Sequence, residues 1–400
     1  MKLPNIIYTL LIATFLERFS FFLIIPFLSI YLSKNFHFSG FQIGIIISMF
    51  AITALFMSFF AAPFIDKINK SMIIYIGLFL ATLSFAVFPL INHFPGFILF
   101  SIINSIGNSL LSPTYKTMIA KLVDQTHKHL VFNIRYFIIN ISAVLAPLLS
   151  TQIQHLGVGV ICNIIVIAYF INTAIFTYAF LKERNNFKTS TMTQKSTFIV
   201  LILIALKNRA FLLLIIGQIL FVFGYNVMTS ILPQFFAIDN SQVEASKLFA
   251  LLLSVNGITV LTCQYFVFKF SQITSIKTAI IAGSTLMPIG LFFMGTLSNF
   301  VFQATAMILF TLGEMLVFTM IDIRIDEISE KDYKGSYYSL AGLQKIGALL
   351  APLIGGVLLD KISNSIELFS ILSIISLISV VFFIMSYKEI TNTIKVKIEP

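Results

Sequence analysis

The chain has 400 residues, of which 58% are hydrophobic and only 10% are charged, and its formal net charge is +10. Soluble domains contain about 25% charged residues, so this composition excludes a water-soluble globular protein and makes the lipid bilayer the solvent. The positive charge does not indicate nucleic-acid binding, because the basic residues lie in short segments between apolar runs and form no basic face.

Twelve apolar runs follow one another along the chain, and each is long enough to cross a bilayer. A spanning helix needs about 20 mostly apolar residues. Turn and charge signals such as Asp66-Lys67 and Asp239-Asn240 separate the runs. The N-terminal run has no convincing cleavage site, so we interpret it as an uncleaved first helix. The predicted spans are 6–33, 41–64, 72–92, 96–121, 131–154, 159–182, 210–236, 246–270, 277–296, 299–323, 335–359 and 365–387. This pattern predicts an all-α membrane protein of twelve transmembrane helices.

The longest polar stretch, residues 183–208, divides these spans six and six. We predict an N-terminal six-helix bundle over 1–182, a cytoplasmic linker over 183–208, a C-terminal six-helix bundle over 209–388 and a cytoplasmic tail over 389–400. With the linker in the cytoplasm, most of the 26 Lys and Arg residues fall in cytoplasmic segments. The positive-inside rule therefore places both termini in the cytoplasm. The exceptions are three residues outside and four within spans: Lys34, Lys247 and Lys361, and Arg18, Lys116, Arg135 and Lys345.

The two predicted halves contain related segments. Ile106-Gly107-Asn108 in span 4 matches Leu312-Gly313-Glu314 in span 10. Ala146-Pro147-Leu148 in span 5 likewise matches Ala351-Pro352-Leu353 in span 11. Parallel six-helix repeats around a binding site at the bilayer midplane are an architecture of transporters.

The loop between spans 2 and 3, from Ala62 to Lys70, resembles the signature Gly-x-Leu-Ala-Asp-Arg-x-Gly-Arg of the major facilitator superfamily. It keeps the acidic and basic positions, while both glycines are replaced. The chain resembles this superfamily over essentially its whole length. The resemblance implies two six-helix bundles and transport by alternating access. It also implies that Asp66 and Lys67 help to hold a cytoplasmic gate closed.

Two branches of the superfamily share further features with the chain. Ala351-Pro352 and Gly355-Gly356 in span 11 resemble a glycine-proline pattern that drug antiporters carry in span 5. However, Asn104 lies near the place of their span-4 arginine. Glu17-Arg18-Phe19 resembles the start of proton-coupled peptide transporters, although Thr14 and Ser112 replace a glutamate and a lysine of that pattern. The overall sequence pattern resembles that of a bacterial multidrug-type exporter more closely.

Span 1 has two ionisable residues near its middle, Glu17 and Arg18. A charge at the bilayer centre costs about 2.5–3.5 kcal/mol, so each needs a partner, water or a function. Adjacent residues on a helix do not face each other, so we do not expect one simple pair. We predict that Glu17 binds a proton or a substrate ammonium group, and that Arg18 binds an anionic substrate group or tunes Glu17. A purely structural ion network is the alternative.

Further candidates for proton or substrate binding lie in spans 4, 5, 10 and 11. Glu314 is the deepest acid of the C-terminal half and is predicted to carry a proton or contact substrate. Lys345, midway along span 11, is predicted to act with Glu314 or with an anionic substrate. Asn140 is its counterpart in span 5, and Asn108 is the counterpart of Glu314. Each amide side chain is alternatively an interhelical hydrogen-bonding group.

Other ionisable residues near the cytoplasmic ends of spans are gating candidates. Lys116 and Asp322 occupy equivalent repeat positions and are predicted to form a salt bridge between the halves that opens and closes. Arg324 and Asp326 allow the alternative of an interfacial charge cluster. Arg135, at the start of span 5, is predicted to be structural or gate-related.

The sequence contains no nucleotide-binding P-loop, no nucleophilic triad and no metal-ligand constellation, and Cys162 and Cys263 fall inside apolar runs. We therefore predict no catalytic residues, no enzyme activity, no metal and no cofactor. The energy for transport would come from an ion gradient, for which we expect protons, or from the solute gradient. The expected partners are a small-molecule substrate and membrane lipid, with no nucleic acid, and the expected state is a monomer.

The preferred hypothesis is a multi-pass exporter in a bacterial cell membrane. It would expel a drug or a zwitterionic metallophore, such as an opine-type siderophore, in exchange for protons. A proton-coupled importer of peptides or nutrients is the first alternative. A non-transporting membrane receptor or scaffold is the second.

Overall fold

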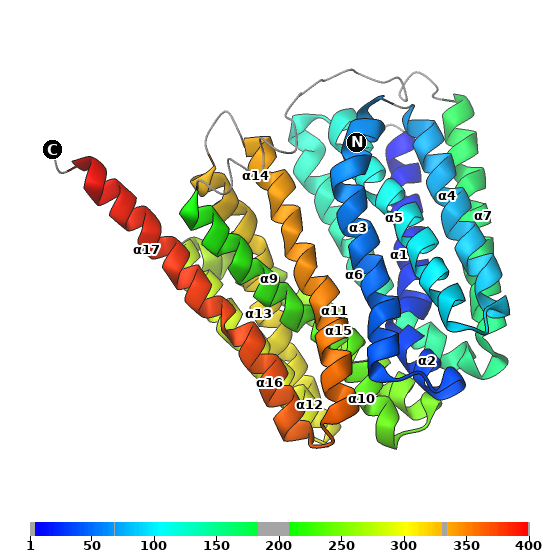
Figure 1. Ribbon diagram of the computed structural model, residues 1–400. Helices are drawn as coiled ribbons and strands as arrows, with labels where there is room; N and C mark the ends of the chain where they lie inside the picture. Colours follow the sequence, from blue (N-terminus) through cyan, green and yellow to red (C-terminus); the bar gives the residue numbers. More distant parts are fainter. Residues whose placement is uncertain (1–4, 68, 183–207, 330–333, 399–400) are drawn as a thin grey trace. The chain divides into compact units, whose positions relative to one another are not determined.

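The computed structural model describes the backbone of residues 5–67, 69–182, 208–329 and 334–398 (Figure 1). This part of the chain is helical throughout and contains 12 helices or helix groups long and apolar enough to cross a membrane. They coincide with the twelve predicted spans, so the prediction of an all-α membrane fold is confirmed. The difference lies at the ends, since most helices extend a few residues beyond the apolar run.

The first six spans comprise α1 Asn5–Ile24, η1 Ile25–Phe27 and α2 Leu28–Phe36; α3 Gly40–Lys67; α4 Lys70–Val87 and η2 Phe88–Leu90; α5 Phe94–Leu122; α6 Gln125–Ile153 and η3 Gln154–Leu156; and α7 Val158–Lys182. The last six comprise α9 Arg209–Ser230 and α10 Leu232–Asp239; α11 Gln242–Ile273; α12 Ile276–Thr296; α13 Phe300–Ile328; α14 Lys334–Ala341, η6 Gly342–Gln344 and α15 Lys345–Lys361; and α16 Ser365–Leu377 and α17 Ser379–Ile398.

Local sequence explains where several helices break or begin. Pro26 lies in η1, where the regular helix of span 1 is interrupted, because proline lacks the N–H that an α-helical hydrogen bond needs. Asparagine side chains begin other helices. Asn69 accepts a hydrogen bond from the backbone of α4, Asn299 from that of α13 and Asn364 from that of α16. An oxygen at this position satisfies a backbone donor that has no partner within the helix.

The chain divides into two compact units. The first contains Met1–His37, Phe56–Gln194 and Asp239–Gly257, and the second contains Phe38–Leu55, Lys195–Ile238 and Ile258–Pro400. The division falls inside α3 and inside α11, so each of these helices contributes to both units. In the first unit α1 packs against α5, α6 and α7, and α4 packs against α5 and α7 (Figure 1). In the second unit α9 packs against α15, α16 and α17, and α12 packs against α13 and α16.

The related glycines of spans 4 and 10 make the same kind of contact. A Cβ atom on Gly107 of α5 would lie 3.0 Å from the carbonyl oxygen of Gly77 on α4. A Cβ atom on Gly313 of α13 would lie 2.7 Å from the carbonyl oxygen of Gly283 on α12. In both units a glycine therefore lets two backbones approach closely, which is the usual role of small residues between membrane helices.

Many large apolar side chains are exposed on the outer surfaces of the spans, among them Phe79 of α4 and Phe170 and Tyr178 of α7. Contiguous apolar surface of this kind is unfavourable in water and is expected of a surface that contacts lipid. The predicted linker lies outside the described residues except for Asn208, whose side chain accepts a hydrogen bond from Phe211 at the start of α9. The predicted tail is helical over most of its length, since α17 continues to Ile398.

Candidate functional site

The first unit contains a cluster of ionisable and polar residues contributed by four helices. Glu17 and Arg18 belong to α1, Ser112 to α5, Arg135 to α6 and Tyr169 to α7. Glu17 is 1% exposed, whereas the side chain of Arg18 is 27% exposed. We call these five residues the Glu17 cluster.

Ser112 joins the two arginines of the Glu17 cluster. A terminal nitrogen of Arg18 donates a hydrogen bond to the Ser112 hydroxyl at 2.7 Å, and a terminal nitrogen of Arg135 donates to the same oxygen at 3.4 Å. Both guanidinium groups therefore point to one side chain. Arg135 also lies within electrostatic reach of Glu17.

Glu17 and Arg18 form an ion pair, with 3.3 Å between the Arg18 Nη2 and the Glu17 Oε1. The expectation that these neighbours would not pair is wrong. Their Cα–Cβ bonds point in different directions around the axis of α1, but an arginine side chain is long enough to turn back toward the preceding residue. The carboxylate oxygens make no hydrogen bond within the described part of the chain, so the pair is held by charge attraction alone.

The charges of the Glu17 cluster do not cancel. Two guanidinium groups face one carboxyl group, which gives a net charge of +1 when Glu17 is ionised and +2 when it is protonated. The Nε atoms of Arg18 and Arg135 also lack hydrogen-bond partners among the described residues. Buried donors without acceptors are costly, so the cluster has both the charge and the free donors to hold an anionic group.

The structure includes residues that the sequence interpretation did not assign to this site. Ser112 had been noted only as a replacement for a lysine, yet it is the shared acceptor. Tyr169 and Tyr115 are almost completely buried and lie within electrostatic reach of Glu17. Thr14, which replaces a second glutamate, donates to the Leu10 carbonyl at 2.8 Å and so satisfies itself within α1.

Lys345 and Glu314 belong to the second unit. The Lys345 ammonium donates to the backbone carbonyl of Ala54 on α3 at 3.0 Å, and this side chain is half-buried. Glu314 is also half-buried and follows directly after Gly313, the contact point of α13 with α12. The partner of this cation inside a span is therefore a backbone carbonyl group and not an acidic side chain.

The two predicted asparagines make hydrogen bonds within their own helices. Asn108 donates to the carbonyl and side-chain oxygens of Asn104 at 3.1 and 2.8 Å, and Asn104 donates to Ser84 of α4 at 3.0 Å. Asn140 donates to the Tyr136 carbonyl at 2.9 Å. The bond between α5 and α4 is therefore made by Asn104, which Asn108 in turn contacts, whereas the printed bond of Asn140 stays within α6.

Comparison with known proteins assigns the family. The sequence profile described as Major Facilitator Superfamily matches residues 10–345. The chain belongs to the Major Facilitator Superfamily. Because the family and the fold are those of transporters, the expectation that the chain is not an enzyme is also confirmed.

Relatives within the superfamily cover most or part of the chain. An uncharacterised MFS-type transporter of Bacillus subtilis, YqjV, is 25% identical over 384 residues, which is 96% of this chain and 93% of that protein. A Na(+), Li(+), K(+)/H(+) antiporter of Planococcus maritimus is 23% identical and covers 86% of this chain and 87% of that protein. The quinolone resistance protein NorA of Staphylococcus aureus is 29% identical over 141 residues, 35% of this chain and 36% of that protein.

Solved structures of superfamily members share the fold. A point mutant of a peptide transporter POT in complex with sulfate superimposes with a TM-score of 0.79 at 14% identity, covering 97% of this chain and 95% of that one. A point mutant of the nucleoside transporter NupG gives a TM-score of 0.76 at 15% identity, covering 96% of this chain and 100% of that one.

Of the gating candidates, Arg135 belongs to the Glu17 cluster, and Lys116 lies about one helical turn after Ser112 on α5. Asp66 and Lys67 are at the end of α3, and their side chains lie outside the described residues. Lys116 of α5 and Asp322 of α13 are both exposed within their own units. Arg324, by contrast, is buried. It pairs with Glu327 on the same helix at 2.9 Å.

Proposed function

We propose that this superfamily member is a proton-coupled secondary transporter that exports a small amphipathic or zwitterionic molecule from a bacterial cell by alternating access. The observation that carries the proposal is Glu17, a fully buried carboxyl group that has an ion pair with Arg18 and no hydrogen-bond donor among the described residues. Both termini would lie in the cytoplasm, with an N-terminal and a C-terminal six-helix bundle as the moving parts.

Burial gives Glu17 the property that coupling requires. Desolvation opposes the charged form of a carboxyl group, whereas nearby cations favour it. A conformational change that alters the desolvation of Glu17, or its distance from the nearby cations, therefore changes the proton affinity of its carboxyl group. Protonation would then shift the population between the outward- and inward-facing states by its difference in affinity for them.

The arginines of the Glu17 cluster favour a substrate that carries an anionic group. An ammonium group of the substrate that pairs with the Glu17 carboxylate competes with the proton for it, which is what exchange requires. A zwitterion fits this arrangement because its ammonium group can meet Glu17 while its carboxylate meets Arg18 and Arg135. A drug or an opine-type metallophore with such groups is the proposed cargo.

The name of one relative supports exchange as the mode of transport, and the name of another supports a drug-like molecule as the cargo. One is described as a cation/proton antiporter and another as a quinolone resistance protein. Quinolones and metallophores are both small molecules with ionisable groups. Alkali cations therefore belong among the test substrates as well.

The test uses inside-out membrane vesicles with an acidic lumen and a pH-sensitive dye. Lipophilic cations, quinolones, zwitterionic metallophores, short peptides, Na⁺ and K⁺ are added in turn. Proton efflux triggered by one class in the wild type is the expected result, and Glu17→Gln should abolish it. Glu367→Gln is the matched control, because Glu367 is an exposed acid at the start of α16 and should leave efflux unchanged.

Three results would reject the proposal. Substrate-triggered proton efflux that survives in Glu17→Gln would remove Glu17 from coupling. Proton-driven accumulation in right-side-out vesicles, with no counterflow in inside-out vesicles, would favour an importer of peptides or nutrients. That second candidate has its own support in the Glu17-Arg18-Phe19 segment. Absence of any flux from folded wild-type protein would favour a receptor or scaffold.

A further inference from the structure

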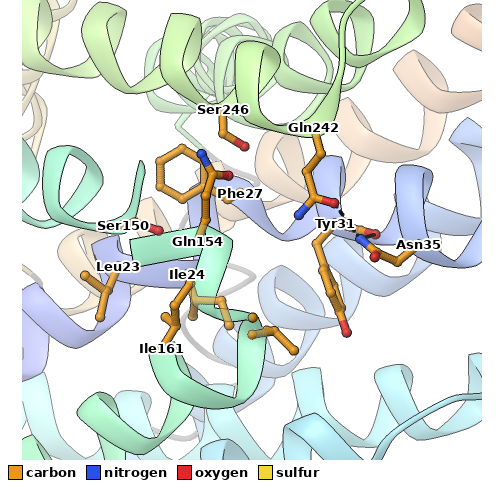
Figure 2. A pocket seen from close by; sticks show the side chains of 12 residues that line it. Leu23, Ile24, Phe27, Tyr31, Asn35, Ser150, Gln154, Ile161, Gln242 and Ser246 are labelled. Atoms are coloured by element: carbon orange, nitrogen blue, oxygen red, sulfur yellow. Dashed lines mark hydrogen bonds between the residues drawn. The ribbon is translucent and has the colours of Figure 1, made fainter. Parts of the chain in front are cut away.

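A cavity of about 290 Å³ lies in the first unit, beside the second half of span 1. It is lined by residues of α1, η1 and α2, by α6, η3 and the start of α7, and by the start of α11. Leu23, the lining residue of α1 nearest to Glu17 in sequence, is six residues further on, which corresponds to about 9 Å along a helix. We call this the Tyr31 cavity, and Figure 2 shows the side chains around it.

The polar side chains of the Tyr31 cavity have unused hydrogen-bonding capacity. Ser150 and Ser246 are 4% and 3% exposed, they line the cavity, and neither hydroxyl makes a hydrogen bond within the described part of the chain. In Figure 2 Ser246 and Gln242 extend from α11 toward Gln154 and Tyr31. Two buried hydroxyls that face a cavity without a protein partner require water or a ligand there.

The side-chain amides of Gln242 and Gln154 each have one polar atom in a hydrogen bond within the protein and a second polar atom available to a ligand. Asn35 of α2 donates to the Gln242 Oε1 at 2.8 Å, which leaves the amide nitrogen of Gln242 as a donor for another group. The Gln154 Nε2 donates to the Thr151 carbonyl at 3.2 Å, which leaves its oxygen as an acceptor. The cavity therefore offers a donor, an acceptor and hydroxyl groups that can serve as either.

The lining of the Tyr31 cavity contains no lysine, arginine, histidine, aspartate or glutamate. A charged molecule would lose its hydration here without meeting an opposite charge, which is strongly unfavourable. Phe27 and Tyr31 add aromatic surface. The Phe27 ring is held edge-on by Phe249 at 6.4 Å, and the Tyr31 ring lies against Phe88 at 5.7 Å.

We propose that the Tyr31 cavity is a binding site for a small uncharged solute that carries hydroxyl or amide groups. Its volume is at the lower limit of ligand pockets in proteins, so a molecule of monosaccharide to nucleoside size is expected. Ser150, Ser246, Gln154 and Gln242 would bind the polar groups, and the aromatic rings would cover an apolar face. This site is distinct from the Glu17 cluster in chemistry, because it contains no acid to bind a proton and no cation to bind an anion.

The test measures binding to the purified full-length protein in lipid nanodiscs by saturation-transfer NMR titration. Uridine, D-glucose and N-acetylglucosamine are the uncharged probes. Glucuronate and glucosamine are charged sugars with the same ring. We expect saturable binding of at least one uncharged probe and at least tenfold weaker binding of the two charged sugars.

Variants locate the binding. Ser246→Ala and Gln154→Leu should each weaken the bound probe about three- to tenfold, the usual effect of losing one hydrogen bond. Ser254→Ala is the matched control on α11, because Ser254 donates to the Ala250 carbonyl at 2.9 Å and does not line the cavity. A thermal-unfolding curve for each variant checks that it is folded.

A second measurement uses accessibility. In a Cys162→Ser/Cys263→Ser background, the thiol of a Ser246→Cys variant should react with a small uncharged maleimide, and the bound probe should slow this reaction. The proposal is overturned if no uncharged probe binds the wild type, which would mean that the cavity holds water only. It is also overturned if Ser246→Ala and Gln154→Leu bind the probe as the wild type does. Because the readout is binding and not transport, loss of proton coupling in Glu17→Gln leaves this test unaffected.

Discussion

The ion pair between Glu17 and Arg18 can be measured with a double-mutant cycle. The variants are Glu17→Gln, Arg18→Gln and the double variant, each compared with the wild type in its free energy of unfolding. Glu17→Gln keeps the shape of the side chain but leaves the guanidinium groups of Arg18 and Arg135 without the one negative charge of the Glu17 cluster. We expect this single variant to be the least stable of the three.

The structure bounds the size of the coupling. Two unit charges 3.3 Å apart attract each other by about 5 kcal/mol at an effective dielectric constant of about 20. Two features reduce this value: the Arg18 side chain is 27% exposed to solvent, and Arg135 repels Arg18 across the shared Ser112 hydroxyl. The expected coupling energy is about 1–3 kcal/mol, in the range measured for residues in one charge network.

The assay is thermal or denaturant unfolding of detergent-purified protein at pH 8, repeated at pH 5. The coupling requires an ionised carboxyl group, so it should become smaller wherever Glu17 takes up a proton as the pH falls. A matched cycle on Arg324 and Glu327, a pair at 2.9 Å in the second unit, shows how the method responds to a pair with an exposed acid. A coupling below about 0.5 kcal/mol at pH 8 would refute the inference that Glu17 is ionised and paired in the folded protein.

Three further substitutions test the packing and the hydrogen bonds directly. Gly313→Ala should destabilise the protein by about 1–3 kcal/mol in thermal unfolding, because its Cβ would lie 2.7 Å from the Gly283 carbonyl oxygen. Gly159→Ala is the control and should leave the stability unchanged, because no atom lies within 4 Å of the new Cβ. Ser112→Ala should cost about 0.5–1.5 kcal/mol by the same measurement and should also weaken binding of the anionic substrate, and unchanged values of both would exclude a joining role for its hydroxyl. Asp360→Ala removes the carboxylate that accepts hydrogen bonds from two backbone N–H groups at the start of α3. The free energy of unfolding should fall by about 1 kcal/mol, and an unchanged value would contradict this capping role.

The number and type of helices could be predicted from the sequence because a membrane imposes a simple rule. Every spanning segment needs about 20 apolar residues, and the breaks between them carry proline, asparagine and charge. Span 1 illustrates the limit of that rule. Its apolar run continues through Pro26, and the sequence did not predict that the regular helix would be interrupted at Ile25–Phe27 while the chain continued across the membrane.

The composition of the Glu17 cluster could be predicted only in part. Glu17 and Arg18 were evident because charges inside an apolar run are costly. Arg135 was predicted to be structural or gate-related because it lies near the start of its apolar run, and sequence position does not show where a long side chain reaches. Ser112 gives no signal in a single sequence, since one hydroxyl among many is ordinary until two guanidinium groups are found to share it.

The repeated segments of spans 4 and 10 show how far sequence symmetry extends into function. Gly107 and Gly313 make equivalent backbone contacts, so the symmetry predicts packing. The next residue differs in chemistry, since Asn108 bonds to Asn104 on its own helix while Glu314 is an acid. In the first unit the buried acid is instead Glu17 on α1. Both repeats keep the close helix contact because any side chain would disrupt it, whereas the ionisable group lies on a different helix of the repeat in each unit.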